Sequence, residues 1–349
     1  MGSVHEQVGQ RRARGDVLSH FDVFNGDADG ICALHQLRLA QPLTSTLVTG
    51  VKRDIELLAR VAARPGDTVT VLDISLDRNR QPLQALLERG VQVEYFDHHF
   101  SGAIPQHPGL RAQIDPAPGV CTSVLVDRYL QGRHRRWAVV AAFGDNLGDT
   151  AWELARACGL GSEPTVALRE LGEAINYNAY GETEADLLVP PARLYRALQP
   201  YASPFDFIAR DPAAALLGEG RRQDLAMAER TEPAFTLPAG RIYVLPDASW
   251  ARRVQGAFAN ALATAAPEQA HAVLCRHAQG GYVVSVRAPV ARPEGTDRLC
   301  RMFPGGGGRT AAAGIDDLAP ERLPEFVRAF GEAFGARPEA ARHGGDPGS

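Results

Sequence analysis

Apolar runs that end in polar turns alternate with helically spaced segments through the first half of the chain. Four of these runs are continuously apolar and then stop in acidic or imidazole side chains, a pattern typical of buried parallel strands. They are FDVFNGDADG (21–30), VTVLDISLD (69–77), VQVEYFDHH (91–99) and WAVVAAFGDNLGD (137–149). Because strand and helix signals alternate, the pattern predicts βαβ units and a parallel sheet.

Helical spacing of apolar residues marks the segments between and after these runs. The predicted helices cover residues 30–40, 54–63, 80–89, 121–130 and 250–265. Residues 152–230 also follow a mostly helical pattern. The predicted strands of the second half are 241–245, 271–276 and 281–287. A glycine-rich turn is then expected to lead into a short helix over residues 305–314, in which the glycine amides would form an anion site at the helix N-terminus.

These patterns predict an α/β protein with an N-terminal parallel-sheet domain and a smaller α/β C-terminal domain. The expected segments are a flexible arm (1–15), the parallel-sheet domain (16–190), a helical connector (191–236), the second domain (237–331) and a disordered tail (332–349). The tail is rich in Gly, Pro, Ala and Arg, a composition that buries too little apolar surface to order a chain.

Composition narrows the class of protein. The 349 residues have a net charge of -4, which weakens the case for binding long nucleic acid. No apolar run is long enough for a membrane span, and the N-terminus lacks a secretory pattern. Five scattered cysteines without CxxC spacing favour a reducing cytoplasm. Lys52 is the one lysine, which we interpret as codon bias, and the neighbouring pair Arg252 and Arg253 is expected to be solvated.

Acidic and imidazole side chains at the ends of the four runs are the candidate chemistry. Ligands of open parallel sheets bind beyond the carboxyl ends of the strands, so these side chains should converge on one crevice. They are Asp27, Asp29, Asp73, Asp97, His98, His99 and Asp145. Like charges this close repel one another, and bound divalent cations are the simplest relief. Oxygen-rich ligation with a minority of imidazole favours manganese, with magnesium as the alternative.

The four motifs resemble those of the DHH phosphoesterase family. GDADG is similar to the first motif, LDIS to the second, Asp97-His98-His99 to the third and FGD to the fourth. GGGGRTAAAG (305–314) resembles the signature of the DHH-associated C-terminal domain. The resemblance covers residues 20–330, and in size the chain is similar to the small-substrate, oligoribonuclease-like branch.

The resemblance implies a ligand set for two metal ions: Asp27, Asp29, Asp73, His98 and Asp145. Asp73 would bridge the ions, and His99 would meet the substrate phosphate or assist proton transfer. Asp97, Asn25 and Asp149 are supporting or uncertain positions. Two departures stand out, because Val23 replaces a histidine that many members have before the first motif, and Arg309 replaces a histidine of the glycine motif.

Arginines beside the glycine run are candidate substrate ligands. The expected set is Arg287, Gly306, Gly307, Gly308 and Arg309, because guanidinium groups and bare amides bind phosphate. The resemblance then implies a two-metal phosphodiesterase of short oligonucleotides, dinucleotides or nucleoside bisphosphates. The alternative functions are a single-strand-specific exonuclease and a non-catalytic nucleotide sensor. The sequence leaves open whether the protein forms a homodimer. We expect the NYNAYG stretch (176–181) to serve packing.

Overall fold

A computed structural model describes residues 18–335 and arranges them around two β-sheets. The arm at 1–15 and residues 336–349 of the tail lie outside the described residues, and the prediction of disorder is wrong for residues 332–334, which end the last helix. The first sheet has the order β2-β1-β3-β4-β5 and is parallel throughout, as predicted. Its strands are β1 (His20–Phe24), β2 (Thr46–Val48), β3 (Thr68–Leu72), β4 (Gln92–Asp97) and β5 (Leu110–Ile114).

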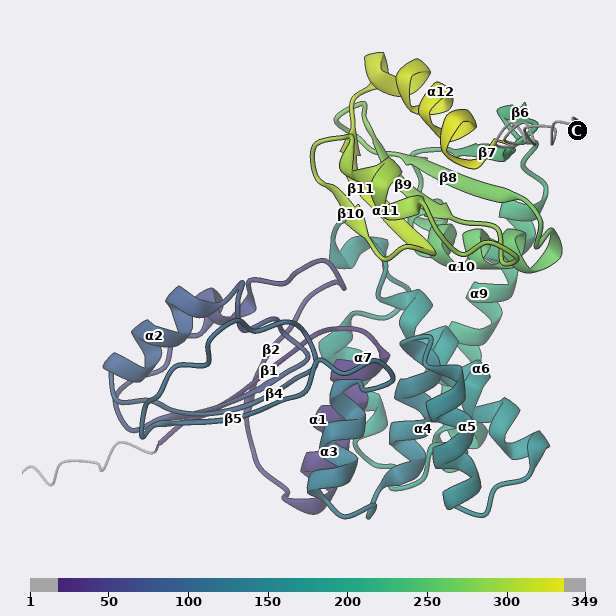
Figure 1. The fold of residues 1–349 in the computed structure, drawn as a ribbon. Helices are drawn as coiled ribbons and strands as arrows, with labels where there is room; N and C mark the ends of the chain where they lie inside the picture. The colour runs from purple at the N-terminus through teal and green to yellow at the C-terminus, as the bar shows by residue number, and fades with distance from the viewer. Residues whose placement is uncertain (1–17, 336–349) are drawn as a thin grey trace, which may run out of the picture.

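Helices cover both faces of this sheet. On one face lies α2 (Arg80–Glu88), as Figure 1 shows. This helix and a short 3-10 turn pack on a cluster made mainly of Val and Leu side chains. The helix predicted over 54–63 is wrong, since only Leu57–Arg60 form that 3-10 turn. The other face carries the larger core, built with a helical bundle. Its helices are α1 (Ala28–Ala40), α3 (Thr122–Tyr129), α4 (Arg135–Gly144), α5 (Gly148–Ala157), α6 (Ser162–Asn178), α7 (Pro191–Leu198) and α8 (Pro204–Arg210).

The fourth apolar run is a helix and not a strand, so that prediction was wrong. Residues 137–144 form the buried part of α4, which lies between α1, α5 and α6. Every one of these side chains is buried, so the segment shows no polar face and no helical period. A continuous apolar run of this length is equally typical of a buried strand and a buried helix. Asp145 nevertheless follows directly, as the C-cap of α4.

Close packing of α4 on α6 depends on glycine at the contact. A β-carbon built on Gly172 would lie 2.1 Å from the carbonyl oxygen of Val140. We expect Gly172→Ala to lower the free energy of unfolding by about 1–3 kcal/mol, because the backbones must separate. Gly218→Ala in α9 (Pro212–Glu229) is the control, since its nearest atom is the flexible Arg222 guanidinium at 3.6 Å. Urea denaturation measures the stability of both variants. A Gly172→Ala variant as stable as wild type would contradict this explanation of the helix packing.

The second sheet is mixed, with the order β10-β11-β9-β8-β7-β6 and one parallel pair, β7–β8. Its strands are β6 (Phe235–Leu237), β7 (Gly240–Leu245), β8 (Ala270–Arg276), β9 (Tyr282–Arg287), β10 (Gly306–Gly308) and β11 (Ala312–Leu318). The helices on it are α10 (Ser249–Ala265), α11 (Thr296–Arg301) and α12 (Leu323–Phe334). The helix expected over 305–314 is wrong, because the segment is the β10–β11 hairpin. No helix starts there, so the anion site expected from a helix N-terminus is lost with it.

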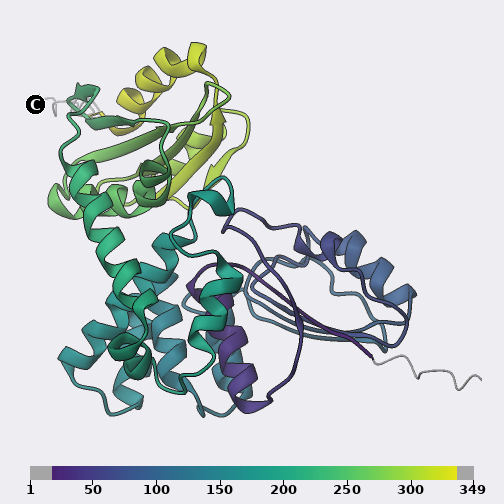
Figure 2. The ribbon, with the colours of Figure 1, turned by 180° about the vertical axis from the view of Figure 1, so that it is seen from behind.

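Helix α9 joins the bundle to the second sheet, as Figure 2 shows from behind. The prediction that Arg252 and Arg253 are solvated was wrong, because both fix α10 at this junction. Arg253 is 9% exposed and donates to Asp224 Oδ2 and Tyr177 Oη, each at 3.0 Å. Arg252 forms an ion pair with Asp186 at 2.7 Å. Across residues 18–335, no helix combines the length and apolar character needed to cross a bilayer.

Candidate metal centre

The aspartates of the first motif lie at the start of α1. They are not on the strand as predicted, because β1 ends at Phe24. Asp27 is the N-cap of α1, and its Oδ1 accepts from the backbone N–H groups of Asp29 (3.0 Å) and Gly30 (3.1 Å). Its Oδ2 accepts from Lys52 Nζ. Burial opposes the charged carboxylate, but the Lys52 ammonium outweighs it and lowers the pKa of Asp27.

Asp29 connects α1 to the N-terminus of α3. Its two carboxylate oxygens accept from the backbone N–H groups of Thr122 and Ser123, each at 2.7 Å. The Ser123 hydroxyl also donates to the Asp29 carbonyl at 2.9 Å. Free N–H groups at a helix start favour an anionic partner, so these hydrogen bonds fix the position of the carboxylate.

Asp73 follows β3 in a left-handed backbone conformation, with φ of 58°. Such a conformation is uncommon outside glycine and is found at functional sites. The side chain is 3% exposed. Burial and the charges of Asp27 and Asp29 raise the pKa of Asp73 well above its usual value. His98, whose Nε2 lies 3.4 Å from Asp73 Oδ1, offsets this rise only in part.

His98 lies at the centre of the cluster. Its Nε2 is 3.4 Å from Asp73 Oδ1, 3.9 Å from Asp145 Oδ2 and 4.0 Å from Asp29 Oδ2. Its Nδ1 bonds the Val120 carbonyl at 3.0 Å, which leaves Nε2 to the carboxylates. Burial lowers the pKa of His98, but the surrounding carboxylates outweigh burial and raise it to about 10. Burial with the nearby aspartates raises the pKa of Asp145 to about 6.

The other two members of the third motif form a pair beside this cluster. His99 Nδ1 bonds Asp97 Oδ1 at 2.7 Å, and its ring lies 4.5 Å from that of His98. Asp73, His98 and His99 offer ligand atoms that all lie within 4.8 Å of one another. Asp97 is fully buried, and its Oδ2 has no hydrogen-bond partner among the described residues.

These donors fit a divalent ion. Three carboxylates and one imidazole nitrogen converge, and burial together with the neighbouring aspartate charges raises the pKa values of Asp73 and Asp145. Oxygen donors with one nitrogen suit Mn²⁺ or Mg²⁺. The donors that surround His98 Nε2 are Asp29, Asp73 and Asp145.

Lys52 is a residue of the site that the sequence analysis missed. Its ammonium bonds Asp27 and lies 3.0 Å from Asn176 Oδ1 and 3.9 Å from Asp145 Oδ1. It also lies over the Tyr180 ring, 5.6 Å from the centroid. The sequence offered one signal, because Lys52 is the one lysine in an arginine-rich chain. Codon bias explains why lysine is rare, but it does not explain why the one lysine contacts the cluster. NYNAYG therefore does more than pack.

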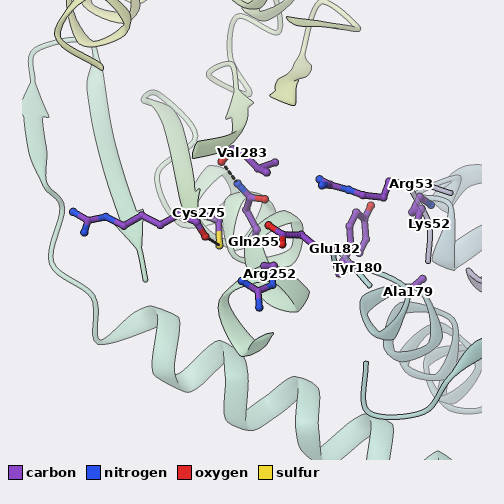
Figure 3. Close-up of a pocket in the computed structure, with 11 residues that line it drawn as sticks. Lys52, Arg53, Ala179, Tyr180, Glu182, Arg252, Gln255, Cys275 and Val283 are labelled. Atoms are coloured by element: carbon purple, nitrogen blue, oxygen red, sulfur yellow. Dashed lines mark hydrogen bonds between the residues drawn. The ribbon is translucent and has the colours of Figure 1, made fainter. Parts of the chain in front are cut away.

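A cavity of about 190 Å³ adjoins the cluster, between the bundle and the second sheet. Figure 3 shows Lys52, Arg53 and Tyr180 on one side of it and Gln255 and Cys275 on the other. The remaining lining residues are Ala179, Gly181, Glu182, Arg252, Arg276 and Val283. Four of the lining side chains are cationic, so the cavity is suited to an anionic ligand.

The structure places the expected substrate residues outside this lining. Arg287, at the end of β9, donates to Asn260 Oδ1 at 2.7 Å. Gly306, Gly307 and Gly308 form β10, and Arg309 is exposed beyond it. The remaining positions are supporting ones: Asn25 donates to the Lys52 carbonyl at 3.2 Å, and Asp149 is exposed in the first turn of α5.

Comparisons with known proteins agree on one class. No family model matches the chain. Single-stranded-DNA-specific exonuclease RecJ of Thermus thermophilus is 30% identical over 291 residues, which are 74% of this chain and 42% of RecJ. The chain thus spans less than half of this relative. The structure of RecJ from the same organism with Mn²⁺ gives a TM-score of 0.54 at 22% identity, covering 92% of this chain and 52% of RecJ.

Two further solved structures share the fold over most of both chains. A DHH domain described as belonging to a family of ribosomal proteins gives a TM-score of 0.58 at 14% identity, covering 90% of this chain and 86% of the other. The pGpG-specific phosphodiesterase PggH from Vibrio cholerae gives 0.50 at 13% identity, covering 89% and 97%. The fold and the four motifs define a DHH-domain protein. The chain belongs to the DHH phosphoesterase family.

Proposed function

We propose that this protein is a divalent-metal-dependent phosphodiesterase. The observation that carries the proposal is the convergence of three carboxylates on His98 Nε2 within 4.0 Å. Asp29, Asp73, His98 and Asp145 would hold the metal, with Mn²⁺ preferred and Mg²⁺ as the alternative. The RecJ relative is a nuclease whose structure contains Mn²⁺. Free cysteines at all five positions fit a reducing cytoplasm, where we place the protein.

Proton transfer falls to His99 in this proposal. When bound, a divalent ion lowers the pKa of water and polarises the phosphoryl oxygens. Nδ1 of His99 is held by Asp97 at 2.7 Å, which leaves Nε2 to accept a proton. The oxygen of water bonds to phosphorus, the bond from phosphorus to the leaving oxygen breaks, and that oxygen takes up a proton. Asp97 orients the ring, as carboxylates do for imidazoles at metal centres.

Short substrates fit the adjoining space better than long strands. A cavity of about 190 Å³ accommodates part of a nucleotide, and its cationic lining suits a phosphate. PggH, which shares the fold, is described as specific for pGpG. We therefore propose short oligonucleotides, dinucleotides or nucleoside bisphosphates as substrates. Arg287, Arg309 and the β10 glycines Gly307 and Gly308 would contact the phosphates when the second sheet closes over them, whereas the Gly306 N–H already donates to the Phe303 carbonyl at 3.0 Å.

A substrate panel tests this proposal. The purified full chain is incubated with Mn²⁺ and with pGpG, other linear dinucleotides, nucleoside bisphosphates and long single-stranded DNA. We expect hydrolysis of at least one short substrate, with long DNA cleaved more slowly. Preferential cleavage of long DNA with a steep salt dependence would instead establish the exonuclease alternative. Binding of Mn²⁺ and dinucleotide without any turnover would establish the non-catalytic sensor and contradict the proposal.

A further inference from the structure

Contacts with three helices or their ends fix the position of the Lys52 ammonium at the metal centre. Its Nζ bonds Asp27 at the start of α1 and Asn176 near the end of α6, and it lies 3.9 Å from Asp145 after α4. An ammonium has three N–H donors. Two are used by Asp27 and Asn176, so one remains for a ligand, because 3.9 Å exceeds hydrogen-bond range.

The backbone of Lys52 is fixed on both sides of the side chain. Its N–H donates to the Ala179 carbonyl at 2.9 Å. Its carbonyl accepts from Asn25 Nδ2 at 3.2 Å, and Asn25 Oδ1 in turn accepts from the Asp27 N–H at 3.2 Å. These hydrogen bonds connect the loop that carries Lys52 to Asp27, the N-cap residue of α1. Lys52 is aimed at the cluster by contacts that a freely rotating surface lysine would lack.

Both carboxylate oxygens of Asp27 accept hydrogen bonds, and the donor on Oδ2 is a cation, whereas the two oxygens of Asp29 accept only from backbone N–H groups. Oδ1 is occupied by the backbone of α1, and Oδ2 is occupied by the ammonium. A metal ion on Asp27 would have to displace Lys52 from between three polar groups. The residue four positions earlier, Val23, is a fully buried apolar side chain and offers no ligand. The donors around His98 Nε2 differ, because His98 can lose its proton and bind a metal ion as neutral imidazole, whereas an ammonium offers no lone pair, although Asp145 among them lies 3.9 Å from Lys52.

We propose that the Lys52 ammonium takes the place of a second metal ion, so that the centre holds one divalent ion and uses lysine as its other cation. This inference rests on the proposed function and replaces the two ions that the family resemblance implies. Four carboxylates face this ion and Lys52. The free N–H of Lys52 would donate to a non-bridging phosphoryl oxygen on the cavity side and stabilise the charge that develops there.

Metal stoichiometry tests this inference without any substrate. Calorimetric titration with Mn²⁺, checked by the EPR spectrum of the loaded protein, should give one ion per chain for wild type and an uncoupled spectrum. Lys52→Ala should give two ions per chain and a spin-coupled spectrum, because Asp27 and Asp73 are then free to share a second ion. Arg53→Ala is the matched control and should give one, since it removes a neighbouring cavity cation that has no contact with Asp27.

Each outcome separates this inference from the proposed function. Two ions in wild type, or one ion in Lys52→Ala, would overturn the role of lysine and leave a metal-dependent enzyme in place. No ion in wild type would overturn both. Lys52→Gln, which keeps the side-chain bulk but not the charge, is measured in the same way if circular dichroism shows that Lys52→Ala is unfolded. It should also bind two ions, and a count of one would overturn the inference.

Discussion

Asp73→Asn is expected to reduce turnover by about 10³-fold or more, whichever short phosphoester proves to be the substrate. Asp73 lies in the middle of the donors, within 3.4 Å of His98 Nε2, so its charge acts directly on the ion. Asparagine keeps the shape and tolerates the left-handed backbone at this position. Asp77→Asn is the control, because Asp77 is exposed and pairs with Arg80 at 3.4 Å. Near-normal rates for Asp73→Asn would contradict the assignment.

The same substitution is expected to stabilise the metal-free protein. Since burial and neighbouring carboxylates raise the pKa of Asp73 in the folded state, ionisation of this group destabilises the fold. The cost is absent below the unfolded-state pKa of about 4 and grows as the pH rises above it. Thermal unfolding with a chelator present should therefore give a higher Tm for Asp73→Asn than for wild type at about pH 7, and equal values near pH 3. A lower Tm at neutral pH would contradict this electrostatic account.

Removing the metal is expected to have the second large effect. A chelator should abolish turnover and lower the Tm, because the carboxylates around His98 then repel one another without the divalent ion. Mn²⁺ at about 100 times its dissociation constant should restore about 2.7 kcal/mol of stability by binding only the folded state. Differential scanning calorimetry with and without Mn²⁺ measures this. Asp73→Asn should show a much smaller shift in Tm on addition of Mn²⁺. A wild-type Tm that changes with neither chelator nor Mn²⁺ would contradict the metal proposal.

The sequence predicted the family, the α/β class and the parallel sheet because short motifs and apolar runs report local chemistry. Asp27, Asp29, Asp73, His98 and Asp145 were expected to converge, and the structure brings them together. The elements that carry three of them differ from the expectation. Asp73 and His98 follow strands, as predicted, whereas Asp27 and Asp29 lie at the start of α1 and Asp145 follows α4. Motif spacing survives such a change of element, so all five residues were found.

Other features depend on packing between distant segments, which no local pattern reports. The run at 137–144 became a helix because other helices surround it, and the glycine run became a strand because it pairs with β11. Lys52 gains its role only when its loop meets α1 and α6. Nothing in the residues next to Lys52 marks it as part of the centre.

Anomalous diffraction at the manganese edge, from crystals grown with Mn²⁺, tests the central claim most directly. We predict a peak at bonding distance from His98 Nε2 and from the carboxylates of Asp29, Asp73 and Asp145. An anomalous difference map without a peak among these four side chains, or with the manganese peak elsewhere on the chain, would contradict the claim.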